Sequence, residues 1–475
     1  MGKLTKIIAT IGPACESTEK ITSLIEKGVN VFRFNFKHNT VEWHSDRIKR
    51  VNEVAESLGK AVGVLIDLAG PEIRMILCND SIDLKIGDEI RIFPKIADCK
   101  DGRCFSVTRP SILPYLADGQ QIVADDGAFR FTVVKKNEEI YLKSNTNGVL
   151  LNNKTLNVPG ADIPLPALND RDVEGLKLAA EHDADFIALS FVRSPDDIRT
   201  VKSAAEKYGV QAKVISKIEA EKAIANIDQI IEATDGVMVA RGDLGVEIPI
   251  EQVPYYQKSI IKKCMIAGKF VITATQMLES MINSPSPTRA EVSDVANAIY
   301  DYTDAIMLSG ETAMGKYPEQ TVEVMRKAAL FYEPKLDHDI RSLVQYKAAD
   351  TTEMICDTAY NLYRQYKQSN QPISGFVVFT QSGKTAEMIS RYRPLVPIFA
   401  FTPYKQTGEM LTINFGVVPL VFKFEQTDHV EINELRRAEK ILSDMKLIKK
   451  DNGKLIVVHG DQWGTGRGAT TIRIL

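Results

Sequence analysis

Short runs of apolar, often β-branched residues recur through the first two thirds of the chain, and amphipathic stretches with a helical period separate them. This alternation is typical of parallel strands connected by helices. The runs number eight and span Lys6 to Ile11, Asn30 to Phe36, Ala61 to Asp67, Asp185 to Val192, Lys213 to Glu219, Gly236 to Arg241, Phe270 to Gln276 and Asp304 to Ser309. Eight parallel strands close a (β/α)8 TIM barrel, so we expect this α/β fold, with the active site at the carboxyl ends of its strands.

Two further regions have a different pattern of apolar and turn residues from the barrel. Between the third and fourth runs, short strand-like pieces lie among turn residues, at Glu89 to Phe93, Gln121 to Ala124 and Glu139 to Leu142. We therefore expect a small β-barrel lid domain at residues 71–166, inserted into a catalytic barrel made of residues 1–70 and 167–334.

A third unit follows the barrel. It combines a helical pattern from Thr352 to Tyr366 with strand-like runs at Gly375 to Thr380, Val417 to Phe422 and Lys454 to Val458. These runs predict a separate C-terminal α/β domain at residues 335–475.

Composition excludes several classes of protein. The chain has 475 residues, of which 44% are hydrophobic and 25% charged, with a formal net charge of -3. This balance gives no indication of a nucleic-acid partner. No run approaches the ~18 apolar residues of a membrane span and the N-terminus lacks a signal-peptide core, so we expect a cytoplasmic protein without a membrane anchor. The six cysteines form no Cys-x-x-Cys pair and have no histidines clustered beside them, which predicts free thiols.

The strongest chemical signal lies at the ends of the fifth and sixth runs. Lys217 and Glu219 are two residues apart, so the alternation of a strand points both side chains to one face. Asp243 follows the next strand in an Arg-Gly-Asp-Leu-Gly segment, whose glycines permit close backbone approach to a ligand. Two carboxylates from neighbouring strands can hold one Mg²⁺. The combination indicates a metal-dependent phosphoryl-transfer site rather than a surface ion pair.

Longer motifs establish a family resemblance. The segments that carry it are Thr273 to Ser280, Ser286 to Glu291, Ser190 to Arg193, Asp294 to Asn297 and Leu308 to Ala313. They resemble pyruvate kinases, and the resemblance covers essentially the whole chain. It implies transfer of the phosphoryl group of phosphoenolpyruvate to ADP, which gives pyruvate and ATP in glycolysis, by an allosteric homotetramer.

The resemblance also implies roles for single residues. Glu219 and Asp243 would bind Mg²⁺ or Mn²⁺, while Lys217 and Arg33 would face the transferred phosphoryl group, a reaction that needs positioning and positive charge. The backbone N–H groups of Gly242 and Asp243 and the hydroxyl of Thr275 would hold the substrate carboxylate, and Thr275 would order a proton relay to the enolate. The residues implied for ADP and ATP are Asn35, His38, Arg74 and Lys154, with Pro13 and Trp43 flanking the base.

The sequence departs from the family after the second and third strands. The usual Arg-x-Asn-x-Ser-His and Asp-Thr-Lys-Gly segments have Lys37, Leu68 and Ala69 at three positions. In the family, the Asn, Ser, Asp and Thr of these segments hold K⁺, and only Asn35 and Asp67 remain here. We expect the Lys37 ammonium to replace K⁺ and make the enzyme K⁺-independent. The alternatives are that Lys37 extends into solvent beside a decayed site, or that it compensates for the lysine absent at Ala69.

The C-terminal domain carries a candidate effector pocket. Hydroxyls and backbone N–H groups follow a strand and open a helix at Thr380, Ser382, Gly383, Lys384 and Thr385, an arrangement that can cradle phosphate. The resemblance implies a pocket for a phosphorylated allosteric effector, which Trp463 and Arg467 of a late loop would contact. An ordinary strand-turn-helix cap is the alternative.

Two other functions stay open. A non-catalytic paralogue that senses sugar phosphates would explain the altered positions 37, 68 and 69, but it has no need for the five residues Arg33, Lys217, Glu219, Asp243 and Thr275 together. A Mg²⁺-dependent barrel lyase acting on 2-oxo acids would also place a metal between Glu and Asp, but it requires neither a nucleotide site nor a lid.

Overall fold

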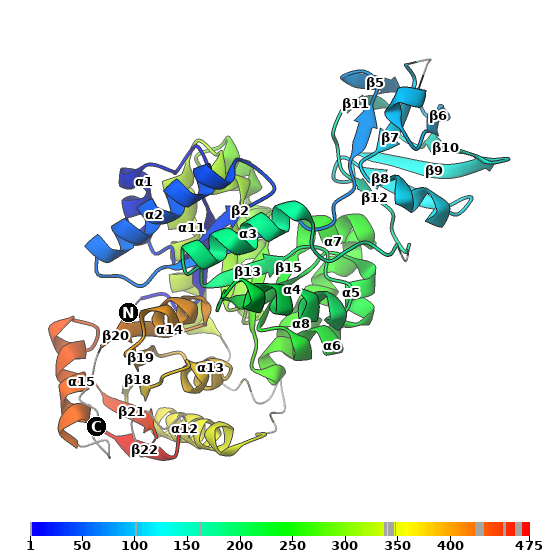
Figure 1. Ribbon diagram of the computed structural model, residues 1–475. Coiled ribbons are helices and arrows are strands. Elements are labelled where there is room, and N and C mark those ends of the chain that lie inside the picture. The colour runs from blue at the N-terminus through cyan, green and yellow to red at the C-terminus, as the bar shows by residue number, and fades with distance from the viewer. Residues whose placement is uncertain are drawn as a thin grey trace.

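A computed structural model of the chain describes residues 2–99, 102–161, 163–336, 340, 346, 348–422, 432–449, 453–460 and 468–475 (Figure 1). The eight predicted runs form one closed barrel, which confirms the predicted fold class. Its strands are β1 (Lys6–Thr10), β2 (Val31–Asn35), β3 (Gly63–Asp67), β13 (Phe186–Leu189), β14 (Lys213–Ile218), β15 (Gly236–Ala240), β16 (Phe270–Ala274) and β17 (Ala305–Leu308). Every neighbouring pair is parallel, and β1 closes the barrel against β17.

The barrel strands are apolar throughout because both of their faces are covered. Inside, the core includes Ile8, Leu65, Ile215, Met238 and Ile272, all fully buried. The outer faces pack against a ring of helices: α1 (Thr18–Glu26), α2 (Val41–Ser57), α3 (Asp170–Glu181), α4 (Pro195–Lys207), α5 (Glu221–Ala225), α6 (Ile227–Ala233), α7 (Arg241–Glu247), α8 (Val253–Ala267), α9 (Arg289–Tyr300), α10 (Gly310–Ala313) and α11 (Pro318–Tyr332). Capping boxes at Asn169 and Thr288 fix where α3 and α9 begin.

The insertion after β3 forms a β domain with its own core (Figure 1). Its strands are β4 (Met75–Leu77), β5 (Ser81–Leu84), β6 (Glu89–Ile92), β7 (Cys104–Val107), β8 (Gln121–Ala124), β9 (Phe129–Lys136), β10 (Glu139–Ser144), β11 (Gly148–Leu151) and β12 (Leu156–Asn157). Seven of them make one sheet in the order β12-β8-β9-β10-β6-β7-β4, and β11 pairs with β5. We call this unit the lid. The three predicted strands β6, β8 and β10 are confirmed, while the boundaries 71 and 166 stay a prediction.

The prediction of free thiols is wrong for three of the six cysteines. Cys15, Cys264 and Cys356 are buried and free, but Cys78, Cys99 and Cys104 lie together in the lid. Strand pairing in the lid brings these three together, and no spacing pattern in the sequence reveals that pairing.

The C-terminal domain lies on the side of the barrel away from the lid (Figure 1). Its elements are α12 (Thr351–Gln368), β18 (Ile373–Phe379), α13 (Lys384–Ser390), β19 (Ile398–Thr402), α14 (Lys405–Met410), β20 (Val417–Val421), α15 (Ile432–Asp444), β21 (Lys454–His459) and β22 (Thr471–Ile474). The sheet order is β20-β19-β18-β21-β22, with β22 antiparallel to β21. The strands β18, β20 and β21 confirm the predicted runs. Among the described residues, no helix is long and apolar enough to cross a membrane.

Candidate active site

Lys217 is the centre of a buried ion-pair network at the carboxyl ends of the barrel strands. Its Nζ lies 3.2 Å from Asp67 Oδ1 and 2.7 Å from Glu219 Oε1, and it donates a hydrogen bond to Ser190 Oγ at 2.8 Å. Arg33 is paired with the same aspartate, since its Nε donates to Asp67 Oδ2 at 2.7 Å. Two cations and two carboxylates therefore share the floor of the site. The sequence prediction that Lys217 and Glu219 face the barrel mouth together is consistent with this arrangement.

The network fixes the charge state of its members. Burial alone would lower the pKa of the Lys217 ammonium, but the carboxylates of Asp67 and Glu219 raise it well above its ordinary value. Burial would raise the pKa of Asp67, but Lys217 and Arg33 hold it below the ordinary value. Lys217 is therefore a permanent cation, and Asp67 a permanent anion, near neutral pH.

Glu219 and Asp243 form the candidate metal site. Burial raises the pKa of Glu219, the Lys217 ammonium opposes that rise, and the Asp243 carboxylate adds to it. Glu219 Oε2 accepts a hydrogen bond from the Phe191 N–H at 2.6 Å. Its other oxygen, Oε1, touches Lys217 but accepts no well-aligned hydrogen bond within the described part of the chain. A buried oxygen with spare acceptor capacity beside a second carboxylate fits a divalent cation.

Thr275 stands at the opposite wall in a strained conformation. Its φ is +68°, in the left-handed region that a β-branched residue rarely adopts. Its Oγ1 accepts a hydrogen bond from the Gly242 N–H at 2.8 Å and donates to the Ala274 carbonyl at 2.6 Å. These hydrogen bonds hold the hydroxyl at the first turn of α7 despite the backbone strain.

One cavity of 510 Å³ lies between the barrel and the lid, and the buried carboxylates of Asp67 and Glu219 are not part of its lining. The barrel supplies Arg33, Asn35, Lys37, His38, Lys217, Gly242, Asp243 and Thr275, and the lid supplies Arg74, Asp125, Asp126, Lys154 and Thr155. Lys154 Nζ pairs with Asp125 Oδ1 at 2.8 Å, and Arg74 Nη2 pairs with Glu72 Oε2 at 2.8 Å. Cations from the two domains therefore face the same space, which suits a polyanionic ligand.

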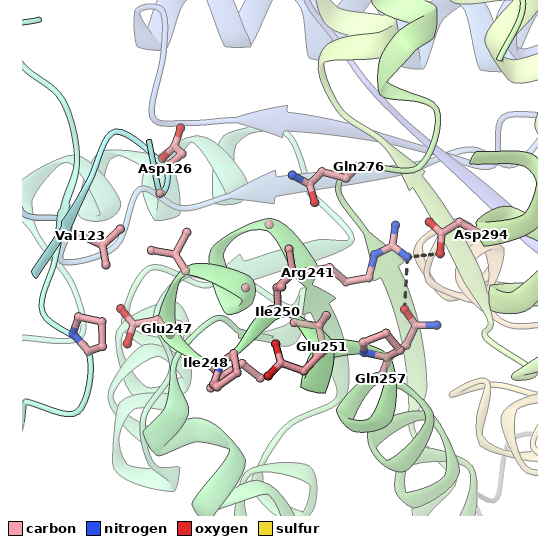
Figure 2. Close-up of a pocket in the computed structure, with 18 of the residues that line it drawn as sticks. Val123, Asp126, Arg241, Glu247, Ile248, Ile250, Glu251, Gln257, Gln276 and Asp294 are labelled. Atoms are coloured by element: carbon pink, nitrogen blue, oxygen red, sulfur yellow. Dashed lines mark hydrogen bonds and ion pairs between the residues drawn. The ribbon is translucent and has the colours of Figure 1, made fainter. Parts of the chain in front are cut away.

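A second, larger cavity of 920 Å³ lies beside α7 (Figure 2). Arg241 crosses its wall, where Nη1 pairs with Asp294 Oδ1 at 2.7 Å and its Nη2 donates to the Thr275 carbonyl at 2.6 Å. Arg241 thereby ties the start of α7 to the Thr275 turn. Its side chain supports the active-site backbone and is not among the residues that line the first cavity.

Comparison with known proteins gives a consistent result. Residues 2–322 match the family model described as "Pyruvate kinase, barrel domain", and residues 359–475 match "Pyruvate kinase, alpha/beta domain". The chain is 42% identical to the pyruvate kinase of Bacillus licheniformis over 96% of this chain and 76% of that protein. It is 43% identical to that of Geobacillus stearothermophilus, over 88% and 71%, and 40% identical to that of Staphylococcus aureus (strain MRSA252), over 98% and 79%. The chain belongs to the pyruvate kinase family.

Lys37 occupies a position where the pyruvate kinase pattern has serine. Its side chain is 17% exposed, and its Nζ lies 3.4 Å from Glu72 Oε1 and 5.3 Å from the centre of the Phe191 ring. The ammonium thus points along the cavity wall rather than into bulk solvent. Leu68, at the second altered position, is fully buried in the outer core against α3 and does not line the cavity.

The nucleotide residues expected from the pyruvate kinase pattern separate into two groups. Asn35, His38, Arg74 and Lys154 line the cavity. Trp43 and Pro13 do not line it. Trp43 lies on α2, where the central guanidinium carbon of Arg47 is 4.7 Å from the centre of the Trp43 ring. Pro13 is exposed.

Three of the expected effector residues, Thr380, Gly383 and Lys384, already have partners. Thr380 Oγ1 accepts a hydrogen bond from the Gly383 N–H at 2.9 Å, and Lys384 Nζ pairs with Asp350 at 2.5 Å. Ser382 is exposed and Thr385 is buried. Trp463 and Arg467 lie outside the described residues.

Three contributors to the site were not predicted from the sequence. Ser190 accepts from Lys217 and donates to the Leu68 carbonyl at 2.9 Å, Phe191 orients Glu219 through its N–H, and Glu72 pairs with both Lys37 and Arg74. The position of Ser190 just after the fourth barrel strand was a usable signal, because active-site residues follow barrel strands.

Proposed function

We propose that this chain transfers the phosphoryl group of phosphoenolpyruvate to ADP, giving pyruvate and ATP in cytoplasmic glycolysis. One cavity carries the proposal. Lys217 and Arg33 line it from the barrel and are held by ion pairs to the buried carboxylates of Asp67 and Glu219. The cations Arg74 and Lys154 line the same cavity from the lid. The family membership supports the reaction. A metal-dependent lyase for 2-oxo acids has no use for the lid cations.

Lys217 and Arg33 are proposed to bind the phosphoryl oxygens. Phosphoryl transfer needs in-line positioning and fixed positive charge more than covalent chemistry. The raised pKa of Lys217 keeps it charged, so it serves as an electrostatic group and not as a general base. Asp67 holds both cations in place, because it contacts the two of them and is almost fully buried.

Glu219 and Asp243 are proposed to hold Mg²⁺ or Mn²⁺. When bound, such a divalent ion neutralises phosphate and enolate charge and orients oxygens. The Phe191 N–H bond keeps Glu219 Oε2 fixed, so the metal would share Oε1 with the Lys217 ammonium 2.7 Å away. Asp243 supplies the second carboxylate from the first turn of α7.

The carboxylate of phosphoenolpyruvate is proposed to bind at the start of α7. Its oxygens would accept from the N–H groups of Gly242 and Asp243 and from the Thr275 hydroxyl, in exchange for the present hydrogen bond between Gly242 and Thr275. Thr275 then lies beside the carbon to be protonated. Because a threonine hydroxyl is a weak acid, we propose that it orders a water relay rather than giving up its own proton.

The nucleotide is proposed to bind between His38 and Asn35 of the barrel and Arg74 and Lys154 of the lid. Both lid cations are held by carboxylates, at Glu72 and Asp125, so phosphate oxygens would compete with those partners as the lid closes. Flanking of the base by Pro13 and Trp43 stays a prediction.

The Lys37 ammonium is proposed to supply the single positive charge that K⁺ supplies in relatives. Its half-buried position on the cavity wall supports this role. Burial raises the pKa of Glu219 and Lys217 is the main group that opposes the rise, but the Lys37 charge acts in the same direction as Lys217 on both Glu219 and Asp67. Turnover of the wild-type protein in tetramethylammonium buffer should therefore change little when K⁺ is added. Lys37→Ser should be inactive without K⁺ and active with it. Strong activation of the wild type by K⁺ would contradict the proposal.

Assembly and regulation follow the family expectation. We propose a homotetramer, with a phosphorylated effector that enters near Thr380 and Ser382 and displaces Asp350 from Lys384. Size-exclusion chromatography with light scattering tests the tetramer. Titration with sugar phosphates at low phosphoenolpyruvate tests the effector.

A coupled assay with lactate dehydrogenase tests the reaction itself. Oxidation of NADH should require phosphoenolpyruvate, ADP and a divalent cation together. A chain that binds sugar phosphates but produces no pyruvate would instead be the non-catalytic paralogue.

A further inference from the structure

Three cysteines converge in the lid, at the ends of β4 and β7 opposite Arg74 and Thr108. Cys78 follows β4, Cys99 follows a short 3-10 turn at Ile96–Asp98, and Cys104 begins β7. Their sulfurs all lie within 4.8 Å of one another. We call these residues the thiol cluster.

The β-sheet of the lid builds this cluster. β4 and β7 are antiparallel, with Met75 opposite Val107 and Leu77 opposite Phe105. One further step along the same register brings Cys78 beside Cys104. Cys99, which follows β6 and the 3-10 turn, lies beside both of these cysteines, and a hydrogen bond of 3.2 Å from Asn79 Nδ2 to the Gly102 carbonyl joins the residues next to Cys78 to those before Cys104.

No single disulfide uses all three sulfurs. Cys99 Sγ is in contact with the sulfurs of both Cys78 and Cys104, and a divalent sulfur can be bonded to only one of them at a time. Each of these two bonds would involve only two of the three sulfurs, although all three lie within 4.8 Å of one another. A single cation, in contrast, can be bound by the thiolates of all three cysteines.

One of the three sulfur pairs has the spacing of a tetrahedral thiolate site, whereas Cys99 Sγ lies closer to the other two sulfurs and would move outward on binding a metal. Zinc–sulfur bonds of about 2.3 Å place the ligand sulfurs of a tetrahedral site about 3.8 Å apart. Cys78 Sγ and Cys104 Sγ are 3.9 Å apart. Cys104 is buried while Cys78 and Cys99 are half-buried, so the cluster is anchored in the core and open to solvent on one side.

We propose that Cys78, Cys99 and Cys104 bind one Zn²⁺, with solvent in the fourth position. A donor set made only of thiolates selects soft or borderline d10 cations over Mg²⁺, so this site is chemically separate from the one at Glu219 and Asp243. Bound Zn²⁺ would link the end of β4, at Cys78, to the start of β7, at Cys104. The opposite ends of the same strands carry Arg74 and Thr108, which are joined by a hydrogen bond of 2.9 Å from the Arg74 N–H.

The experiment measures how much Zn²⁺ the full-length protein retains. The protein is kept reduced, dialysed first against Zn²⁺ and then against a weak chelator. Elemental analysis should find one Zn²⁺ per chain in the wild type. Cys78→Ser and Cys104→Ser should each weaken Zn²⁺ binding at least about 100-fold, more than the loss of an outer-sphere partner costs. Cys264→Ala, a buried thiol on α8 outside the cluster, should keep the full equivalent.

Cobalt substitution gives a readout that does not depend on activity. Co²⁺ in the wild type should show thiolate charge-transfer absorption and the intense visible bands of a tetrahedral ion, and both should disappear in Cys104→Ser. Three outcomes would overturn the proposal: no Zn²⁺ retained by the reduced wild type, equal retention by Cys104→Ser, or octahedral cobalt spectra. A cluster that forms only a disulfide on oxidation and binds no Zn²⁺ when reduced would also overturn it.

Discussion

At the scale of single residues, Lys217 is the most constrained charge in the site. It is almost fully buried, touches two carboxylates and donates to Ser190. Removing one partner of a buried ion pair is costly because the other charges stay behind without compensation. We therefore expect Lys217 to have two roles: it stabilises the buried carboxylates of Asp67 and Glu219, and it binds phosphate.

Lys217→Met should separate these two contributions. We expect the free energy of unfolding to fall by roughly 3–5 kcal/mol, because Asp67 and Glu219 lose their shared cation. The kcat should fall by at least about 10²–10³, the usual cost of removing one preorganised charge-stabilising group. Urea unfolding and steady-state kinetics measure both. A variant that retains wild-type kcat would show that Lys217 has only a structural role.

Sequence alone was sufficient for residues whose geometry is local. Lys217 and Glu219 were predicted to share a face from their spacing of two, and that is a property of any strand. Ser190 and Glu72 were missed because their roles arise only when other strands and the lid are folded around them. The family pattern predicts Trp43 beside the nucleotide base; Trp43 does not line the cavity, and its role stays a prediction.

At the scale of elements, α7 connects the active site to the lid. Its first turn carries Asp243, and its last residue, Glu247, accepts a hydrogen bond from Asn157 of β12 at 3.1 Å. Burial raises the pKa of Glu247 to about 7. The junction of lid and barrel therefore contains a carboxyl that titrates near neutral pH.

Glu247→Gln should change how stability depends on pH. The folded state binds the Glu247 proton more tightly than the unfolded state does, so protonation of Glu247 stabilises the fold. This stabilisation is complete below pH ~4.5 and is lost as pH rises through about 7. Relative to Glu247→Gln, the wild type should lose up to about 3 kcal/mol of unfolding free energy between pH 4.5 and pH 8. Urea unfolding across this range measures the difference. A difference that does not vary with pH would exclude Glu247 as the titrating group, and Glu251→Gln, an exposed neighbour, serves as control.

The element pattern could be predicted where strands are buried on both faces. All eight barrel strands were found because they are continuous apolar runs of parallel sheet. β22 was missed because Thr471–Ile474 is a short, half-buried edge strand that gives little apolar signal. β19 was missed although Ile398–Thr402 is fully buried, since it lies in a long apolar stretch whose boundaries give little signal.

At the scale of the whole molecule, a buried ion pair joins the C-terminal domain to the barrel. Arg393 Nη2 lies 2.5 Å from Asp304 Oδ2, and the two side chains are 2% and 1% exposed. Asp304 also accepts from the N–H groups of Val271 and Phe415, so it links two barrel strands to the C-terminal domain. The pair lies at the amino ends of the barrel strands, away from the catalytic cavity.

Arg393→Leu should therefore weaken the molecule without disabling its chemistry. We expect a loss of roughly 3–5 kcal/mol in unfolding free energy, because Asp304 is left buried without its cation. Arg393→Leu combined with Asp304→Asn should recover part of this loss. Urea unfolding and kcat measured on the same preparations test the separation. A large fall in kcat at full stability would instead indicate communication between the two ends of the barrel.

The most direct test of the whole account is the stoichiometry of the reaction. Purified wild-type protein with phosphoenolpyruvate, ADP and Mg²⁺ should form ATP and pyruvate in equal amounts, quantified separately by luciferase and by lactate dehydrogenase, and Lys217→Met should form neither at a comparable rate. Pyruvate without ATP, or no product from a folded wild type, would contradict the proposal that this cavity transfers phosphoryl groups to ADP.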